Sequence, residues 1–76
     1  MFSELDIVVL KQDFDKFNLK KGDTGTIVQV YKKGEAYEVE FVAADGNTVA
    51  LITLKESDIR HVKNNELLHV REFATA

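Results

Sequence analysis

The sequence predicts an all-β domain of five short strands, and three observations support this fold class. Apolar and polar residues alternate with a period of two, most clearly in AYEVEFV at residues 36–42, and this alternation is typical of a half-buried strand. Three of the four glycines, Gly22, Gly34 and Gly46, have charged neighbours in short polar segments, which are typical of tight turns. Proline is absent, so that residue restricts no predicted strand to a sheet edge.

The first predicted strand covers residues 5–10 (LDIVVL), which are apolar and rich in β-branched side chains. Residues 11–19 are polar, with Phe14, Phe17 and Leu19 interspersed. Because so small a domain needs nearly all of its apolar residues for the core, we expect a long loop that folds its aromatic side chains back onto the sheet.

Two glycines three residues apart precede the second predicted strand, residues 26–31. Gly22 and Asp23 predict a turn, because glycine tolerates positive φ and an aspartate can accept a hydrogen bond from the backbone two residues on. Gly25 predicts a bulge or a sharp bend, where a side chain would collide with a neighbouring backbone. The alternation places Thr26, Val28 and Val30 on one face of the strand and Ile27, Gln29 and Tyr31 on the other.

The remaining elements follow from the same signals. Asp45-Gly46 is a strong hairpin signal between two strands. The predicted elements are a hairpin turn at 32–35, a strand at 36–42 with Tyr37, Val39 and Phe41 inward and Glu38 and Glu40 outward, a turn at 44–47, a strand at 48–54, one helical turn at 55–58, and a last strand at 59–62.

This order of elements predicts a small five-stranded SH3-like barrel over residues 1–62, with residues 63–76 as a C-terminal extension that packs on the barrel or on a partner. A five-stranded OB-fold is the alternative. It usually needs more residues and a helix between its third and fourth strands, whereas Asp45-Gly46 closes that connection directly. The sequence therefore favours the SH3-like barrel.

The composition limits the functions that the chain can perform. A domain of this size buries only about 60–65% of the surface of its unfolded chain, which leaves little room for a deep substrate pocket. Cysteine is absent, so disulfides and thiolate metal sites are excluded and a reducing compartment is expected. The apolar run at residues 7–10 is too short for a signal peptide or a membrane span. We therefore expect a cytoplasmic protein.

The motif K-K-G-D-T-G-T-I-V at residues 20–28 resembles the glycine-centred turn of KOW-type SH3-like domains. More broadly, residues 4–62 resemble a family of short uncharacterised bacterial proteins, often cyanobacterial, that forms a domain of unknown function. This resemblance implies the fold and no established activity. Members of the family resemble small partners encoded beside other short proteins, which implies an antitoxin or immunity role. The matching segments are Leu5-Asp6, residues 19–26, 36–42, 45–46 and 50–55, and Ile59-Arg60.

The chain offers few candidates for catalysis or metal binding. His61 lies in the last predicted strand and His69 in the extension, and two histidines without a third ligand do not form a zinc site. Residues 22–25 lack the Lys-Ser/Thr and the helix of a phosphate-binding loop, and residues 45–47 lack the spaced acidic ligands of a calcium loop. We expect a protein that is not an enzyme, with no catalytic residue, no metal site and no cofactor.

Two lysine pairs favour nucleic acid as one class of partner. Lys20-Lys21 and Lys32-Lys33 lie at the two ends of the second predicted strand, and Phe17 and Tyr31 could stack on bases. The formal net charge of −3 opposes this hypothesis, because cationic side chains supply most of the affinity for phosphates.

Acidic side chains favour a basic protein instead. Glu38 and Glu40 point outward from the third predicted strand, and with Glu35, Asp13 and Asp15 they predict an acidic patch. Such a patch would steer a basic partner, such as a toxin that binds nucleic acid, and would contribute to specificity.

The extension carries more apolar residues than a disordered tail needs. After the polar residues 63–65 come Leu67, Leu68, Val70 and Phe73. These side chains either cover an open end of the chain's own barrel or pair with another chain, a partner or a second copy, as an added strand or a docked helix.

We therefore expect a non-enzymatic protein-binding module, in its most specific form an antitoxin or immunity-type partner of a neighbouring basic toxin. The predicted partner-binding residues are Glu38, Glu40, Leu67, Leu68, Val70 and Phe73. The alternatives are a KOW-like RNA- or ribosome-associated module and a structural adaptor.

Overall fold

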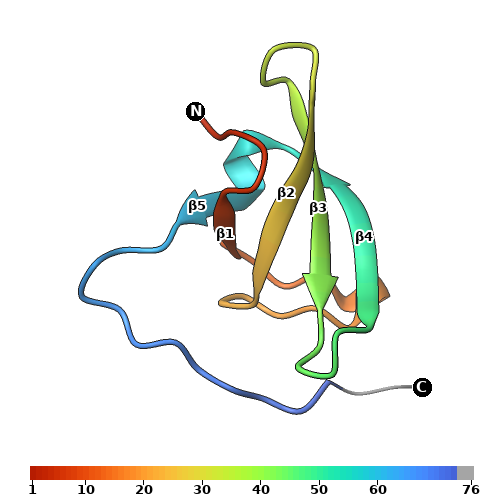
Figure 1. Ribbon diagram of the computed structural model, residues 1–76, viewed down its shortest axis with the longest axis vertical. Coiled ribbons are helices and arrows are strands. Elements are labelled where there is room, and N and C mark those ends of the chain that lie inside the picture. Colours follow the sequence, from red (N-terminus) through yellow and green to blue (C-terminus); the bar gives the residue numbers. More distant parts are fainter. Residues whose placement is uncertain (74–76) are drawn as a thin grey trace.

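The computed structural model describes residues 1–73 and contains five antiparallel strands in one twisted sheet (Figure 1). The predicted all-β class and the predicted number of strands are therefore confirmed. Residues 74–76, the last three of the predicted extension, lie outside the described residues. The elements are β1 (Ile7–Leu10), the one-turn 3-10 helix η1 (Asp15–Phe17), β2 (Thr24–Tyr31), β3 (Ala36–Val42), β4 (Thr48–Leu54), the 3-10 helix η2 (Glu56–Asp58) and β5 (Ile59–His61).

The strands are ordered β4-β3-β2-β1-β5, so the last strand returns to pair with the first. Val9 of β1 lies opposite Thr24 of β2 on one side and Arg60 of β5 on the other. β4 and β5 form the two edges, and within residues 1–73 the sheet is not closed between them. The result is a barrel-like fold with a gap between β4 and β5; the end at which β3 turns into β4 and β2 begins is called the open end of the sheet below (Figure 1). No helix among the described residues has the length and apolar character needed to cross a membrane.

The core is built mainly from the inward faces of β1, β3 and β4. Tyr37 lies at its centre with an exposed fraction of 0%, and its hydroxyl donates a hydrogen bond to Glu56 Oε1 over 3.2 Å. The ring of Phe2 packs edge-on against Tyr37, with 5.4 Å between the ring centroids. The buried cluster consists of Phe2, Val8, Leu10, Leu19, Ile27, Tyr37, Val39, Phe41, Ile52, Leu54 and Ile59.

The inward positions predicted for β3 are confirmed, because Tyr37, Val39 and Phe41 are all buried. The faces predicted for β2 are wrong. Ile27 lies opposite Val39, but the next pair in register is Gln29 with Glu38, so β2 has an extra residue there. This bulge interrupts the period of two. Ile27 and Val30 consequently both face the core, whereas Val28 is exposed.

Gly25 has the close neighbours that the sequence predicted, although the bulge lies further along the strand. It is buried between β1 and β3, opposite Val8. A β-carbon at this position would lie 2.7 Å from Val39 Cγ1, 2.8 Å from Phe41 Cε2 and 3.0 Å from the carbonyl oxygen of Glu40. Glycine is therefore required here for space.

The long loop between β1 and β2 folds back only in part as predicted. Phe14 packs against the core and pairs with Leu19, which is itself buried. Phe17, in η1, is exposed, so the prediction that both aromatic rings of the loop cover the sheet is wrong for Phe17. The loop still delivers Asn18 and Asp23 to the open end of the sheet, beside the C-terminal segment.

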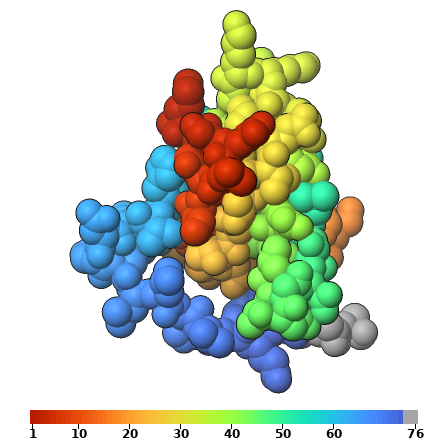
Figure 2. Space-filling view, in the orientation of Figure 1, coloured from red at the N-terminus to blue at the C-terminus, as the bar shows by residue number. Residues whose placement is uncertain are grey.

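The C-terminal segment, residues 63–73, is called the strap below. It contains neither a helix nor a strand. It leaves β5, runs along the lower edge of the molecule and passes beneath the β3–β4 hairpin (Figure 1). In the space-filling view the strap is the blue arm along the lower edge (Figure 2). The strap thus lies against the chain's own domain, one of the two arrangements that the sequence allowed.

Candidate functional site

The strap is attached to the domain near its beginning by a paired arginine and glutamate. Arg60 in β5 donates two hydrogen bonds to Glu66, Nη1 to Oε1 over 2.8 Å and Nη2 to Oε2 over 2.7 Å. The backbone N–H of Lys63 also donates to Glu66 Oε1 over 2.6 Å, which closes a turn at the polar residues 63–66. The Arg60 guanidinium, with the Lys63 N–H as a second donor, lowers the pKa of Glu66 to about 2.

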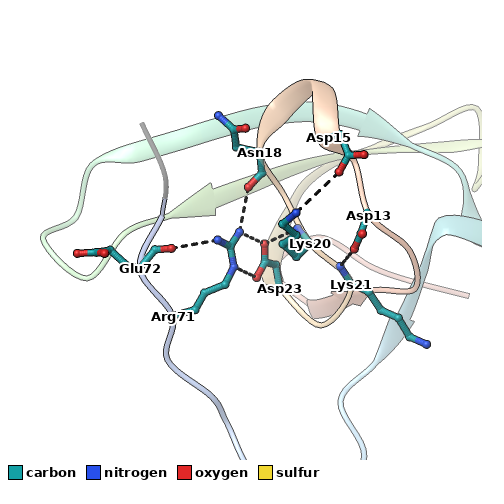
Figure 3. A network of polar contacts seen from close by, with 8 residues as sticks. All are labelled: Asp13, Asp15, Asn18, Lys20, Lys21, Asp23, Arg71 and Glu72. Atoms are coloured by element: carbon teal, nitrogen blue, oxygen red, sulfur yellow. Dashed lines mark hydrogen bonds and ion pairs between the residues drawn. The ribbon is translucent and has the colours of Figure 1, made fainter. Parts of the chain in front are cut away.

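The second attachment lies near the end of the strap and joins residues 48 positions apart in the sequence. Arg71 Nε donates to Asp23 Oδ1 over 2.7 Å, and Arg71 Nη2 donates to Asp23 Oδ2 over 2.5 Å. The same Nη2 donates to the carbonyl oxygen of Asn18 over 3.0 Å. Figure 3 shows the guanidinium between the two acceptor residues. A two-point pair of this kind fixes the orientation of the arginine as well as its position.

Asp23 is also oriented by a hydrogen bond from its own loop. The backbone N–H of Lys20 donates to Asp23 Oδ2 over 2.8 Å, so the turn at residues 20–23 orients the carboxylate. Burial alone would raise the pKa of Asp23, but the hydrogen bonds from Arg71 and from the Lys20 N–H outweigh it and lower the pKa. The carboxylate is therefore charged at neutral pH.

Phe73 is the only one of the four apolar residues predicted in the strap that packs against the core. Its ring lies 5.9 Å from the guanidinium carbon of Arg71, within the range of a cation–π contact. Phe73 was predicted to bind a partner together with Leu67, Leu68 and Val70; in the structure it is partly buried against the core, whereas those three side chains are exposed.

Between its two attachments the strap is exposed and encloses a space. Leu67, Leu68 and Val70 have exposed fractions of 95%, 79% and 91%. Behind them a cavity of about 520 Å³ separates the strap from the open end of the sheet. Its apolar walls include Leu19, Phe41, Val49 and Val62. The strap is therefore fixed at two points and carries unburied apolar side chains between them.

The acidic residues predicted for partner binding lie on the outer face of β3. Glu38 accepts a hydrogen bond from Thr53 over 2.6 Å, and Glu40 accepts one from Thr48 over 2.5 Å. Both carboxylates are half-buried by these cross-strand contacts. The loop acids form separate contacts, Asp13 with the backbone N–H of Lys21 and Asp15 with the Lys20 side chain (Figure 3). The predicted patch is thus divided between the sheet and the loop.

The two histidines lie apart. His61 Nε2 is 3.4 Å from Asp6 Oδ2, and its ring lies 4.5 Å from that of Phe2. The Ser3 backbone N–H and the His61 ring lower the pKa of Asp6. His69 is exposed on the strap. Among residues 1–73, no group of three or more histidine, aspartate or glutamate side chains is placed to hold a metal ion.

The attachments predict that acid detaches the strap. Asp23 and Glu66 both have a pKa lowered in the folded chain, so their contribution is complete above the ordinary carboxyl pKa of about 4. It is lost as the pH falls through the folded values, which for Glu66 is about 2. We expect the Nε–H resonance of Arg71 to shift in an NMR titration as the pH falls below the ordinary carboxyl pKa of about 4, because the pKa of Asp23 is lowered. Asp23→Asn should remove that shift and leave the Arg60 resonances unaffected; an Arg71 resonance independent of pH would contradict the assignment.

The geometry defines a class of protein: a small all-β domain with one antiparallel sheet, whose open end is covered by a strap from the same chain. The chain belongs to the family described as a domain of unknown function (DUF4926), which it matches over residues 4–61. No curated protein and no solved structure matches the chain. The family match ends with β5, so the strap lies outside it.

Proposed function

We propose that the chain is a non-enzymatic protein-binding domain, cytoplasmic and of the SH3-like type, that acts as an antitoxin or immunity-type partner of a basic bacterial protein. The observation that supports this proposal is the exposure of Leu67, Leu68 and Val70 on a strap fixed at both ends. The antitoxin role follows the resemblance of residues 4–62 to small partner proteins encoded beside other short proteins.

The strap suits protein binding because its backbone is attached to the domain on both sides of its exposed apolar residues. Burial of a leucine or valine side chain contributes roughly 1.5–3 kcal/mol, and a binding segment that is held in one conformation loses less entropy on association. The attachments at Arg60–Glu66 and Arg71–Asp23 hold the backbone on either side of Leu67, Leu68 and Val70. A partner that covers these side chains would therefore gain apolar contact without first ordering the segment.

The charge of the chain supports a basic partner. The formal net charge is −3, and Glu38 and Glu40 lie side by side in one row of the outer face of β3. Complementary charge accelerates association and disfavours acidic competitors. The RNA-binding alternative draws on the exposed Lys32 and Lys33 at the β2–β3 hairpin. Of the other lysine pair, the Lys20 side chain lies 3.9 Å from Asp15, whereas Lys21 contacts Asp13 through its backbone N–H alone.

Capture from a lysate of the native host tests the proposal. We expect the full chain to retain one basic protein, and we expect the variant Leu67→Ser/Leu68→Ser/Val70→Ser to lose it. Because the three side chains are exposed, the free energy of unfolding should stay within about 0.5 kcal/mol of the wild-type value.

A matched control is Leu5→Ser, since Leu5 and Leu68 have the same exposed fraction of 79% and only Leu68 lies on the strap. This control should capture as much protein as the wild type. Capture must also survive nuclease treatment. Loss of the captured protein on nuclease treatment, or equal capture by the strap variant, would overturn the proposal.

A further inference from the structure

The domain binds an arginine side chain of its own strap through three oxygens. Three oxygens converge on one guanidinium: both carboxylate oxygens of Asp23 and the carbonyl oxygen of Asn18. The receptor formed by these oxygens and the adjoining apolar cavity is called the acceptor below. Asp23 is oriented by the Lys20 N–H, and Asn18 follows η1 in the left-handed conformation, with φ 59°. Both features arise from contacts within the loop between β1 and β2.

The acceptor is specific for arginine rather than for positive charge. Arg71 uses Nε and Nη2 toward Asp23 and directs Nη2 toward Asn18 as well, while Nη1 donates to the carbonyl oxygen of Glu72 over 3.1 Å. A planar fork with several fixed donors can satisfy these acceptors together, whereas the compact ammonium of lysine cannot. The acceptor therefore discriminates between two cations of equal charge.

A second position lies two residues further along the bound segment. Phe73 packs against the core at the cavity, and its ring lies beside the guanidinium of Arg71. The cavity walls near it, which include Phe41 and Val49, are apolar. The domain thus contacts two side chains of the bound segment, an arginine and, two residues later, an aromatic ring.

The present occupant covers the acceptor incompletely. Arg71 engages its three oxygens, but a space of about 520 Å³ remains between the strap and the apolar walls of the cavity, and Leu67, Leu68 and Val70 are exposed. The family match over residues 4–61 includes Asn18 and Asp23 but none of the strap. The matched range of this chain therefore includes the three acceptor oxygens but not the residues that now occupy them.

We propose that the acceptor binds an arginine-x-aromatic segment of the basic partner, and that the strap is an internal competitor which the partner displaces. Displacement of Arg71 and Phe73 leaves the Arg60–Glu66 attachment in place, so Leu67 and Leu68 stay held beside the domain while a partner arginine replaces Arg71 on Asp23. The inference deepens the proposed function and rests on it for the existence of the partner. The acceptor itself can be tested without any partner.

The probe is a fluorescent peptide with the sequence of residues 69–73, His-Val-Arg-Glu-Phe, titrated against the full chain. The strap acts at an effective concentration in the millimolar range, so wild-type protein should bind the peptide weakly. The full-length variant Arg71→Ala/Phe73→Ala empties the acceptor. Because the strap then no longer competes with the peptide, this variant should bind the peptide at least about tenfold more tightly than the wild type. Adding Asp23→Asn should abolish that gain, although the asparagine side chain can still accept the Lys20 N–H and keep the turn.

Two further measurements test whether the acceptor prefers arginine to lysine and whether its occupant belongs to the same chain. A peptide with lysine in place of arginine should bind the emptied variant at least about tenfold less tightly, because it lacks the fork. Equal binding of both peptides, or equal binding by wild type and the emptied variant, overturns the inference. Sedimentation should show a monomeric wild-type chain; a dimer that Asp23→Asn dissociates would identify the occupant as the strap of a second copy and would also overturn it. None of these results depends on whether a partner is captured from the host.

Discussion

Tyr37→Ala is expected to remove a large part of the free energy of unfolding at 25 °C, about 3–5 kcal/mol. Removal of a large buried aromatic side chain costs about 3–5 kcal/mol, and a domain of this length has a total stability of roughly 4–11 kcal/mol. Tyr37 is fully buried and packs against Phe2, while its hydroxyl reaches across the core to Glu56. Its loss would therefore open the centre of the core and release the N-terminal residues at the same time.

Urea unfolding followed by circular dichroism measures this effect. The matched control is Tyr37→Phe, which keeps the ring and removes only the hydrogen bond to Glu56, at a cost of about 0.5–1.5 kcal/mol. If alanine and phenylalanine lower the free energy of unfolding by the same amount, the ring does not hold the core together and the description of the core is wrong.

Gly25→Ala is expected to destabilise the domain by about 1–3 kcal/mol, the usual cost of overpacking a core. A β-carbon there would lie well inside van der Waals distance of Val39 Cγ1 and Phe41 Cε2, and 3.0 Å from a backbone oxygen of β3. Since the backbone oxygen belongs to the β2–β3 pairing, it cannot move without disturbing the sheet. The sign of the effect is informative, because a glycine-to-alanine change without a collision normally stabilises a protein.

Gly46 provides the comparison for this prediction. It has φ 89°, and a β-carbon added there would have no neighbouring atom within 4 Å. A replacement at Gly46 therefore lowers the stability only through the strain of a side chain at positive φ. Gly25→Val should be worse than Gly25→Ala, whereas Gly46→Ala and Gly46→Lys should have similar melting temperatures. If the Gly25→Ala protein is as stable as the wild type, the space between Gly25 and β3 is large enough for a methyl group and the predicted collision is wrong.

Most of the fold could be predicted because local pattern and tertiary environment agree. β3 was predicted with its observed bounds, Ala36–Val42, since its alternation of apolar and acidic residues matches a sheet with one buried face. The faces of β2 could not be predicted in the same way. Val28 is β-branched and apolar like its neighbours, and only the pairing with β3 shows that it occupies a bulge. Phe2 was missed as a core residue because it lies outside any strand.

Less of the candidate site than of the fold could be predicted from the sequence. The exposure of Leu67, Leu68 and Val70 agrees with their predicted role but does not test it. Asp23 was recognised as a turn residue, and its second role as the acceptor for Arg71 has no local signal, because the two residues lie 48 positions apart. Arg60 and Glu66 were likewise not predicted to pair. A segment of alternating apolar and charged residues does not reveal which side chains face its own domain.

The division of the strap has a physical cause. Arg71 and Phe73 lie two residues apart, and in an extended segment side chains with this spacing point to the same side. When they bind Asp23 and the core, Val70 must point away from the domain. For Leu68 and Val70, attachment and exposure are therefore two results of one arrangement; the exposure of Leu67, which has the spacing of Arg71 and Phe73, does not follow from it. This arrangement is why the same segment can both cover the open end of the sheet and offer apolar side chains to a partner.

Isothermal titration of the captured protein, once purified, into the wild-type chain and into Leu67→Ser/Leu68→Ser/Val70→Ser decides whether the strap is a docking segment. Loss of three central apolar contacts, each worth more than about 1 kcal/mol, should weaken binding by at least about 100-fold. An affinity unchanged within about twofold, with the variant as stable as the wild type, would contradict the proposed function and would leave the strap as a cover for its own domain alone.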